Sequence, residues 1–219
     1  MKLAITGADC SMGAMLCRRL AGQHEVVPIG SADQTPEDVG PAYRSVDLKT
    51  PAETDAAILG VDMVIHAQPH DPACGLTGRL TDGSEAGLIE QVSRGTYVLM
   101  QAAKQAGIGR VVLISQLRLY DAVPEPYLVT AGWQPRPRAQ AESLAPYMAE
   151  LVCREIARVG HIEAVNLRMG ELDAVEGTSA DDAVSAVQQA LLMDMSEMGY
   201  NWHEQHVATG GRFAAPGKS

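Results

Sequence analysis

Residues 2 to 20 read Lys2-Leu-Ala-Ile-Thr-Gly-Ala-Asp-Cys-Ser-Met-Gly-Ala-Met-Leu-Cys-Arg-Arg-Leu20. The apolar run from Leu3 to Ile5 predicts a buried strand, and the apolar residues at helical spacing after Gly7 predict a helix. A strand, a glycine turn and a helix in this order form a site for dinucleotide phosphates, because the first amides of the helix face the ligand. The stretch therefore predicts a dinucleotide-binding domain.

The small residues of this turn have separate tasks. In the usual fingerprint the first glycine makes the tight turn, the second lets the backbone approach the pyrophosphate, and the third lets the helix pack on the strand. Gly7 and Gly13 occupy the first and third positions, and Cys10 occupies the second. We expect Gly7, Cys10, Ser11, Met12 and Gly13 to contact the cofactor, with affinity reduced by the bulk of the Cys10 side chain. Cys10 is either a small residue tolerated in the turn or a thiolate activated by the helix N-terminus.

Composition limits the class of protein. The chain has 219 residues, 46% of them hydrophobic, which is ample for one α/β domain. A formal charge of −10 argues against a nucleic-acid partner. The sequence contains no apolar run of the roughly 18 residues that a membrane-spanning helix needs. Its four cysteines lack paired spacing, so we expect reduced thiols in a cytoplasmic protein.

Short apolar runs alternate with helical patterns, as in a doubly wound parallel sheet. The expected strands are residues 3–5, 25–29, 63–66, 111–115, 164–167 and 201–207, and the expected helices are residues 12–22, 51–59, 85–107, 143–159 and 180–193. We expect residues 1–175 to form a dinucleotide-binding Rossmann-type domain, extended by a short helix and strand in residues 176–209. Residues 210–219 are expected to be a disordered tail.

Six motifs occur in the order found in one known family. They are Thr6-Gly7 through Gly13, Val46-Asp47-Leu48, Asp62-Met-Val-Ile-His-Ala67, Gly95-Thr96, Arg110-Val-Val-Leu-Ile-Ser115 and Asn166-Leu-Arg-Met-Gly170. Together they resemble the extended short-chain dehydrogenase/reductases, also called the NAD-dependent epimerase/dehydratase family. The resemblance implies a Rossmann-type fold and an NAD or NADP cofactor, held further by Asp47, Leu48, Ala67, Gln68 and Ser115. It also implies that the family's C-terminal substrate domain is largely missing, since only residues 171 to 219 follow Gly170.

The catalytic residues of that family are replaced. Its members use a tyrosine whose hydroxyl is made acidic by a lysine four residues later, with a Ser or Thr holding the substrate oxygen. None of the six tyrosines here has such a lysine, and the alignment puts Glu142 at the tyrosine, Pro146 at the lysine and Gln116 at the Ser or Thr position. The chain therefore resembles a truncated, atypical member. Tyr120, Glu142 and His70 remain as weak catalytic candidates.

A few single residues bear on the choice between NAD and NADP and on metal binding. Neither an acid nor an arginine occupies Ile29 to Ser31, where a ribose hydroxyl or a 2′-phosphate would be held, so NAD and NADP are not distinguished. Asp47 after a strand is either a cofactor contact or a turn cap. His66, His70, Asp71 and Cys74 are the only cluster with a metal-like composition, but prolines interrupt it and we expect no metal.

Two functions remain open. One is an unusual NAD(P)-dependent oxidoreductase or epimerase acting on a small polar or sugar-like substrate, with an arginine such as Arg118, Arg136 or Arg138 holding an anion unless these residues are merely solvated. The other is a non-catalytic nucleotide sensor or partner subunit. In the resembling family the helices at 85–107 and 143–159 form a dimer interface, so we expect a homodimer or a heterodimer.

Overall fold

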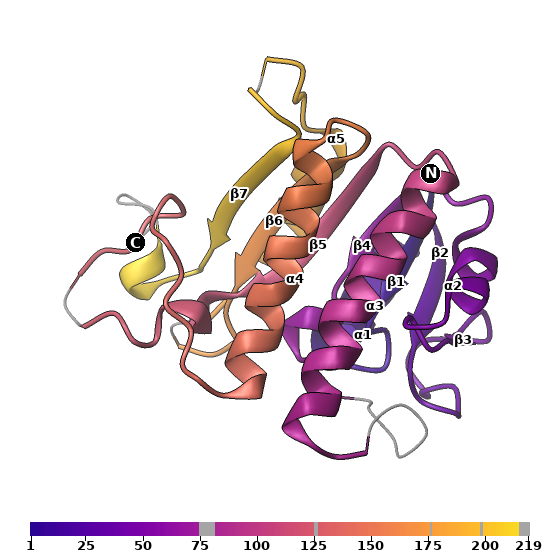
Figure 1. Ribbon diagram of the computed structural model, residues 1–219, viewed down its shortest axis with the longest axis horizontal. Coiled ribbons are helices and arrows are strands. Elements are labelled where there is room, and N and C mark those ends of the chain that lie inside the picture. The colour runs from indigo at the N-terminus through magenta and orange to yellow at the C-terminus, as the bar shows by residue number, and fades with distance from the viewer. Residues whose placement is uncertain (75–81, 125–126, 176, 198, 215–219) are drawn as a thin grey trace.

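The computed structural model describes residues 1–74, 82–124, 127–175, 177–197 and 199–214, which form a sheet with helices on both faces (Figure 1). The sheet has seven strands in the order β3-β2-β1-β4-β5-β6-β7, and every neighbouring pair is parallel. The strands are β1 (Lys2–Thr6), β2 (Glu25–Gly30), β3 (Arg44–Ser45), β4 (Met63–His66), β5 (Arg110–Gln116), β6 (Glu163–Met169) and β7 (Trp202–Val207). The predicted Rossmann-type architecture is confirmed.

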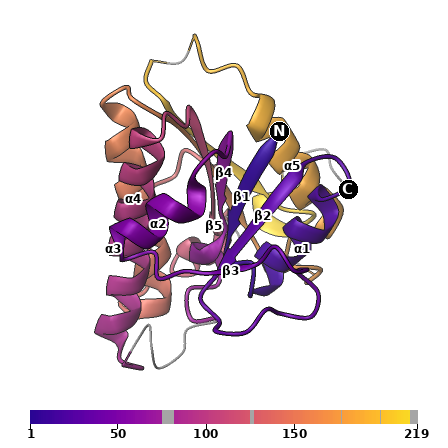
Figure 2. The same cartoon turned by 90° about the vertical axis from the view of Figure 1, so that its right-hand side faces the viewer.

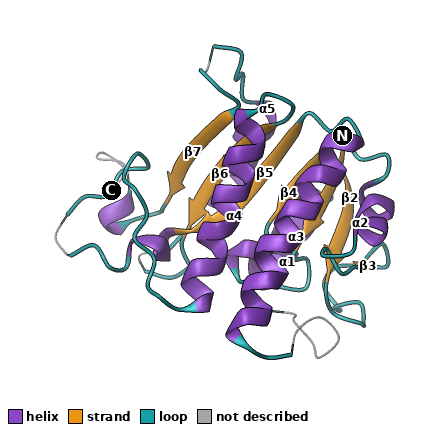
Figure 3. Cartoon of the chain, viewed as in Figure 1, coloured by secondary structure: helices purple, strands orange, loops and turns teal. Residues whose placement is uncertain are grey.

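Two groups of helices cover the two faces of this sheet (Figures 2 and 3). One core packs α2 (Pro51–Ile58), α3 (Glu85–Gln105) and α4 (Ala141–Arg158) on the side of Ala4, Val64 and Val111. The other packs α1 (Ser11–Leu20) and α5 (Ala180–Leu192) on the side of Leu3, Ile5 and Ile65. Alternate residues of one strand therefore serve opposite cores, as a strand buried on both faces requires.

Capping residues set the helix ends close to where the sequence predicts them. The hydroxyl of Ser84 accepts from the Gly87 amide, and that of Ser179 accepts from the Asp182 amide. Gly107 and Gly160, which follow α3 and α4, have φ of +73° and +82°, the left-handed conformation that glycine adopts without strain. Both helix stops are as predicted.

Two features of the structure were not expected. The two-residue strand β3 is too short to leave a periodic signal. Residues Gly211–Phe213, in the segment expected to be disordered, form a 3₁₀ turn in which the Arg212 guanidinium donates to the carbonyl of Val123. Strand β7 matches the strand expected at residues 201–207; it pairs with β6 and so joins the same sheet as the N-terminal strands. Among the described residues, no helix is long and apolar enough to cross a membrane.

The glycine turn seats α1 against the sheet. A Cβ atom on Gly13 would lie 2.0 Å from the Gly7 carbonyl oxygen, and one on Gly7 would lie 2.8 Å from the Gln68 Cα. Gly7 also has φ of +67°. Backbone therefore meets backbone at both positions, and no side chain fits between them.

We predict that Gly13→Ala lowers the free energy of unfolding by about 3 kcal/mol, because the added methyl group overlaps backbone that cannot move away cheaply. Gly22→Ala is the matched control, since a Cβ at Gly22 would meet nothing within 4 Å. Chemical denaturation of both variants measures the difference. Equal stability of the two variants would show that the packing of Gly13 on Gly7 is not a constraint.

Candidate functional site

The candidate site lies at the carboxyl ends of the strands, where the strand order reverses between β1 and β4. In open parallel sheets ligands bind in the crevice at this switch point. The turn of residues 7–10 follows β1, and the 3₁₀ turn η1 (Gln68–His70) follows β4. The close contact of Gly7 with Gln68 brings these two segments together, so Gly7, Ala67 and Gln68 lie side by side at the crevice.

Helix α1 begins at this crevice with amide groups that lack helical acceptors. Cys10 is its N-cap residue and makes no side-chain capping bond. The first amides of a helix have no partner within the helix, so those of Ser11, Met12 and Gly13 are available to an anion. The donor set suits the pyrophosphate of a dinucleotide.

Cys10 is a buried thiol. Its side chain is 3% exposed. A hydrogen bond with Cys74, burial and the neighbouring Asp9 carboxylate all raise the pKa of Cys10 far above its usual value. The helix N-terminus does not outweigh these effects, so the structure supports the small tolerated residue over the activated thiolate.

Asp9 was not predicted as a site residue. Its side chain connects the glycine turn to the end of β2. Its Oδ2 atom accepts hydrogen bonds from the Ser31 amide at 2.7 Å, from the Ala32 amide at 2.8 Å and from the Ser31 hydroxyl at 3.0 Å. A carboxylate is therefore fixed where β2 ends. No periodic or motif signal reveals it, because its partners are more than 20 residues away in sequence.

A cavity of about 410 Å³ extends from the start of α1 toward β5 and β6. Ser11, Gln116, Glu142 and Glu171 contribute to its lining, together with His70, Asp71, Pro72, Ala73, Arg118, Ser143, Met169 and Leu172. Two of the three catalytic candidates, His70 and Glu142, thus line one cavity beside the helix N-terminus. The described lining residues include no tyrosine and no lysine.

Two hydrogen bonds, one with the Gly170 carbonyl and one from the Gln116 side chain, fix His70 in this cavity. The imidazole Nε2 lies 3.0 Å from the Gly170 carbonyl oxygen, and Gln116 donates through Nε2 to the His70 carbonyl. Burial lowers the pKa of His70, so its ring is neutral at neutral pH. Its Nδ1 atom is buried with no hydrogen-bond partner among the described residues. Glu142, in contrast, is exposed at the start of α4.

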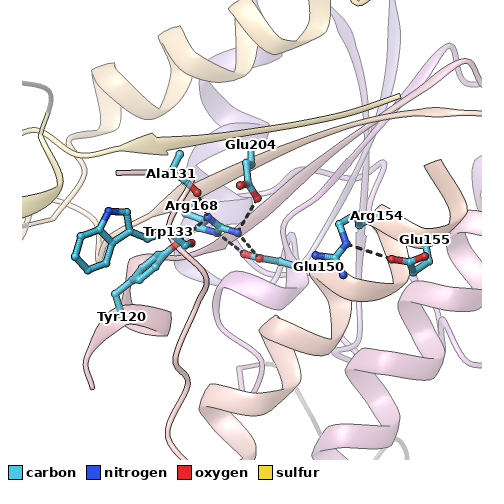
Figure 4. A network of polar contacts seen from close by, with 8 residues as sticks. All are labelled: Tyr120, Ala131, Trp133, Glu150, Arg154, Glu155, Arg168 and Glu204. Atoms are coloured by element: carbon cyan, nitrogen blue, oxygen red, sulfur yellow. Dashed lines mark hydrogen bonds and ion pairs between the residues drawn. The ribbon is translucent and has the colours of Figure 1, made fainter. Parts of the chain in front are cut away.

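The third candidate, Tyr120, belongs to a buried polar network instead (Figure 4). Its hydroxyl donates to the Trp133 carbonyl at 2.8 Å and accepts from Arg168 at 2.6 Å. Arg168 also binds both carboxylate oxygens of Glu150, at 2.9 and 2.8 Å, and reaches Glu204 at 2.9 Å. Burial raises the pKa of Tyr120, which makes the phenol still less suited to proton transfer. The structure gives Tyr120 a role in holding α4, β6 and β7 together.

Three further predicted cofactor residues, Asp47, Leu48 and Ser115, are held by the protein's own turn and core. The Asp47 carboxylate accepts from the Lys49 amide at 3.0 Å, which is the turn-cap arrangement. Leu48 is buried against Gly95 of α3. Ser115 is fully buried near the end of β5, and its hydroxyl has no partner among the described residues.

The histidine cluster does not assemble. His66 is buried between the hydroxyls of Thr6 and Thr96, at 2.7 and 2.9 Å, and burial lowers its pKa to about 3. Within the described ranges, no three His, Cys, Asp or Glu side chains are placed to hold a metal ion.

The strand order, the glycine turn and the amides at the start of α1 define a Rossmann-type domain of the dinucleotide-binding class. Residues 3–202 match the model of the NAD dependent epimerase/dehydratase family, so the chain belongs to that family. No curated protein sequence matches it.

Several solved structures share this fold. A mutated uronate dehydrogenase has a TM-score of 0.76 at 20% identity, covering 96% of this chain and 74% of the other. A mutant uronate dehydrogenase from Agrobacterium tumefaciens complexed with NAD has a TM-score of 0.77 at 18% identity, covering 97% and 80%. A UDP-glucose 4-epimerase complex with NAD from Thermus thermophilus has a TM-score of 0.73 at 18% identity, covering 96% and 78%. At this level of identity the likeness concerns the fold.

The Arg168 network generates a stability prediction. Glu150→Gln should lower the free energy of unfolding by about 3 kcal/mol, because it leaves a buried guanidinium without its bidentate carboxylate. Glu155→Gln on the same helix is the control, since Glu155 pairs with Arg158 at the surface and should leave the melting temperature unchanged. Thermal and urea unfolding of both variants measures the contrast. If the two variants melt together, the buried pair does not hold the fold.

Proposed function

We propose that the chain binds NAD(P) across the carboxyl edge of its sheet and does not use the tyrosine and lysine chemistry of its family. The observation that carries the proposal is the start of α1, where a Gly7 to Gly13 turn directs uncapped amides into the crevice. Family membership and the NAD complexes of structurally similar proteins support the choice of ligand.

In this proposal the amides of Ser11, Met12 and Gly13 hold the pyrophosphate, and Gly7, Ala67 and Gln68 form the adjoining backbone surface. Bound NAD(P) supplies a hydride acceptor or donor. The cavity beside α1 then takes a small polar or sugar-like substrate. Arg118, whose contacts with Asp121 and Glu171 at 3.7 and 3.8 Å are loose and exposed, is available to an anionic group.

If the chain is catalytic, we propose Glu142 as the group that exchanges a proton with substrate. It is exposed in the cavity, at the position of the family's tyrosine, whereas Tyr120 is held by Arg168. Pro146 at the lysine position has no amide hydrogen and no charge. His70, neutral and buried, is proposed to orient substrate rather than to carry the proton.

A non-catalytic nucleotide sensor or partner subunit is the second candidate. It is favoured by the composition of the cavity, which presents neither a tyrosine nor a lysine among its lining residues. We propose the cytoplasm as its compartment, in keeping with the free state of Cys10, Cys17, Cys74 and Cys153.

We expect NAD(P) to raise the melting temperature by several degrees, since ligand at about 100 times Kd adds about 2.7 kcal/mol to the free energy of unfolding. Cys10→Gly should strengthen the binding of NAD(P), because it removes the bulk of the Cys10 side chain, whose thiol contacts Cys74. Cys153→Ser, in the opposite core, is the control. Calorimetry showing no heat with NAD or NADP, oxidised or reduced, up to millimolar concentrations would rule out the proposed function.

We expect no oxidation or epimerisation of uronates or common nucleotide sugars, measured by absorbance of the reduced cofactor and by product analysis. The reason is that none of the six tyrosines has a lysine four residues later, and without a neighbouring ammonium group a phenol keeps a pKa of about 10. Turnover lost in Tyr147→Phe would show that the alignment of α4 with the catalytic helix is wrong. Turnover lost in Glu142→Gln alone would establish the catalytic version of the proposal.

We also propose association through α3 and α4, in a homodimer or with an intact relative. These helices offer three apolar residues for packing against a second helix pair. They are Leu88 and Ile156, which are partly buried at the edge of the core, and Tyr97, which is exposed. Light scattering at tens of micromolar should give twice the mass of the chain, and Tyr97→Glu should halve it. A monomer at every concentration tested would eliminate the homodimer.

A further inference from the structure

We infer that Asp9 selects the cofactor, favouring NAD over NADP. The inference rests on the proposed function, because it concerns the adenosine end of the same dinucleotide site. In Rossmann domains an acid at the end of the second strand receives the ribose hydroxyls of NAD, and an arginine nearby receives the 2′-phosphate of NADP. Here β2 ends at Gly30 and is followed by Ser31 and Ala32, so the strand itself supplies no acid.

The structure brings the acid from a different element. Asp9 stands in the glycine turn after β1, yet its Oδ2 atom takes the Ser31 amide, the Ala32 amide and the Ser31 hydroxyl, all within 3.0 Å. These donors hold the carboxylate at the end of β2. They are also the donors that a 2′-phosphate would need there, so Asp9 already satisfies them.

The second carboxylate oxygen remains for a ligand. Among the described residues the only hydrogen bond to Oδ1 of Asp9 comes from the Cys10 thiol, at 3.8 Å. A thiol is a weak donor, so Oδ1 keeps its capacity to accept from a ribose hydroxyl. A carboxylate accepts hydrogen bonds from hydroxyl groups and repels a phosphate.

Gly30 and Tyr43 accommodate the Asp9 carboxylate at the end of β2. A Cβ atom on Gly30 would lie 2.6 Å from Asp9 Oδ1 and 2.5 Å from the Tyr43 hydroxyl oxygen, so glycine is required at the strand end. The Tyr43 hydroxyl donates to the Ala32 carbonyl at 3.0 Å, which fixes the backbone that holds Asp9. Gly30 and Tyr43 therefore both help to fix the position of the Asp9 carboxylate.

The arginine that could have favoured NADP is engaged elsewhere. Arg44 is the only arginine between residues 20 and 78. Its guanidinium donates to the Ala57 carbonyl at 2.7 Å and to the Ala56 carbonyl at 3.4 Å, at the end of α2. Among the described residues, no lysine or arginine forms an ion pair with Asp9. A 2′-phosphate would therefore meet the Asp9 carboxylate without a counter-ion beside it.

Calorimetric titration of the full chain with NAD and with NADP tests the inference, with Kd as the readout. We expect NADP to bind about 100-fold more weakly than NAD, as an uncompensated like charge implies. Asp9→Asn should reduce this ratio to less than about tenfold, chiefly by strengthening NADP, since the charge is removed while the side chain keeps its shape. Asp9→Ser, a smaller neutral variant, should shift the ratio in the same direction.

Asp33→Asn is the matched control, because Asp33 also follows β2 but is exposed. It should leave the ratio unchanged. Equal affinities in the unmodified chain, a preference for NADP, or an equal gain for both nucleotides in Asp9→Asn would overturn the inference; the last result would mean that Asp9 blocks the site. Binding without preference would refute the selection alone, whereas no binding of either nucleotide would refute the proposed function with it.

Discussion

The approach of Gly13 to the Gly7 carbonyl is the contact on which the rest of the site depends. With no side chain at either residue, α1 lies directly on the end of β1, and its first amides open into the crevice. The same turn presses Gly7 onto Gln68 and carries Asp9 to the end of β2. One backbone contact thus places both the amides that we propose for a pyrophosphate and the acid that we propose for a ribose.

The core and the cavity differ in how their charged groups are paired. Arg168 and Glu150 form a buried bidentate pair between β6 and α4, and their loss would leave a charge unpaired in the interior. At the cavity, by contrast, the lining residues Glu142 and Gln116, together with Pro146 of α4, stand where the sequence resemblance places the family's proton-transfer residues. This arrangement agrees with the proposal that the chain binds a dinucleotide and does not use the tyrosine and lysine chemistry of its family.

Much of the fold could be predicted from the sequence, because apolar periodicity and capping residues act locally. The strand before Gly7 and the ends of α3 and α4 near Gly107 and Gly160 are of this kind. The site was less predictable. Asp9 finds its partners only when β1 and β2 pair. Tyr120 is a catalytic candidate from the sequence, but its hydroxyl accepts from Arg168, which lies 48 residues away in sequence. Contacts between distant segments leave no local pattern.

A crystal structure of the chain grown with NAD tests most directly whether the glycine turn is a working dinucleotide cradle. The geometry predicts the pyrophosphate on the amides of Ser11, Met12 and Gly13, with the adenosine ribose hydroxyls on Oδ1 of Asp9 and the nicotinamide toward the cavity of His70 and Glu142. A nucleotide bound elsewhere, or a crevice that stays empty at millimolar NAD, would contradict it.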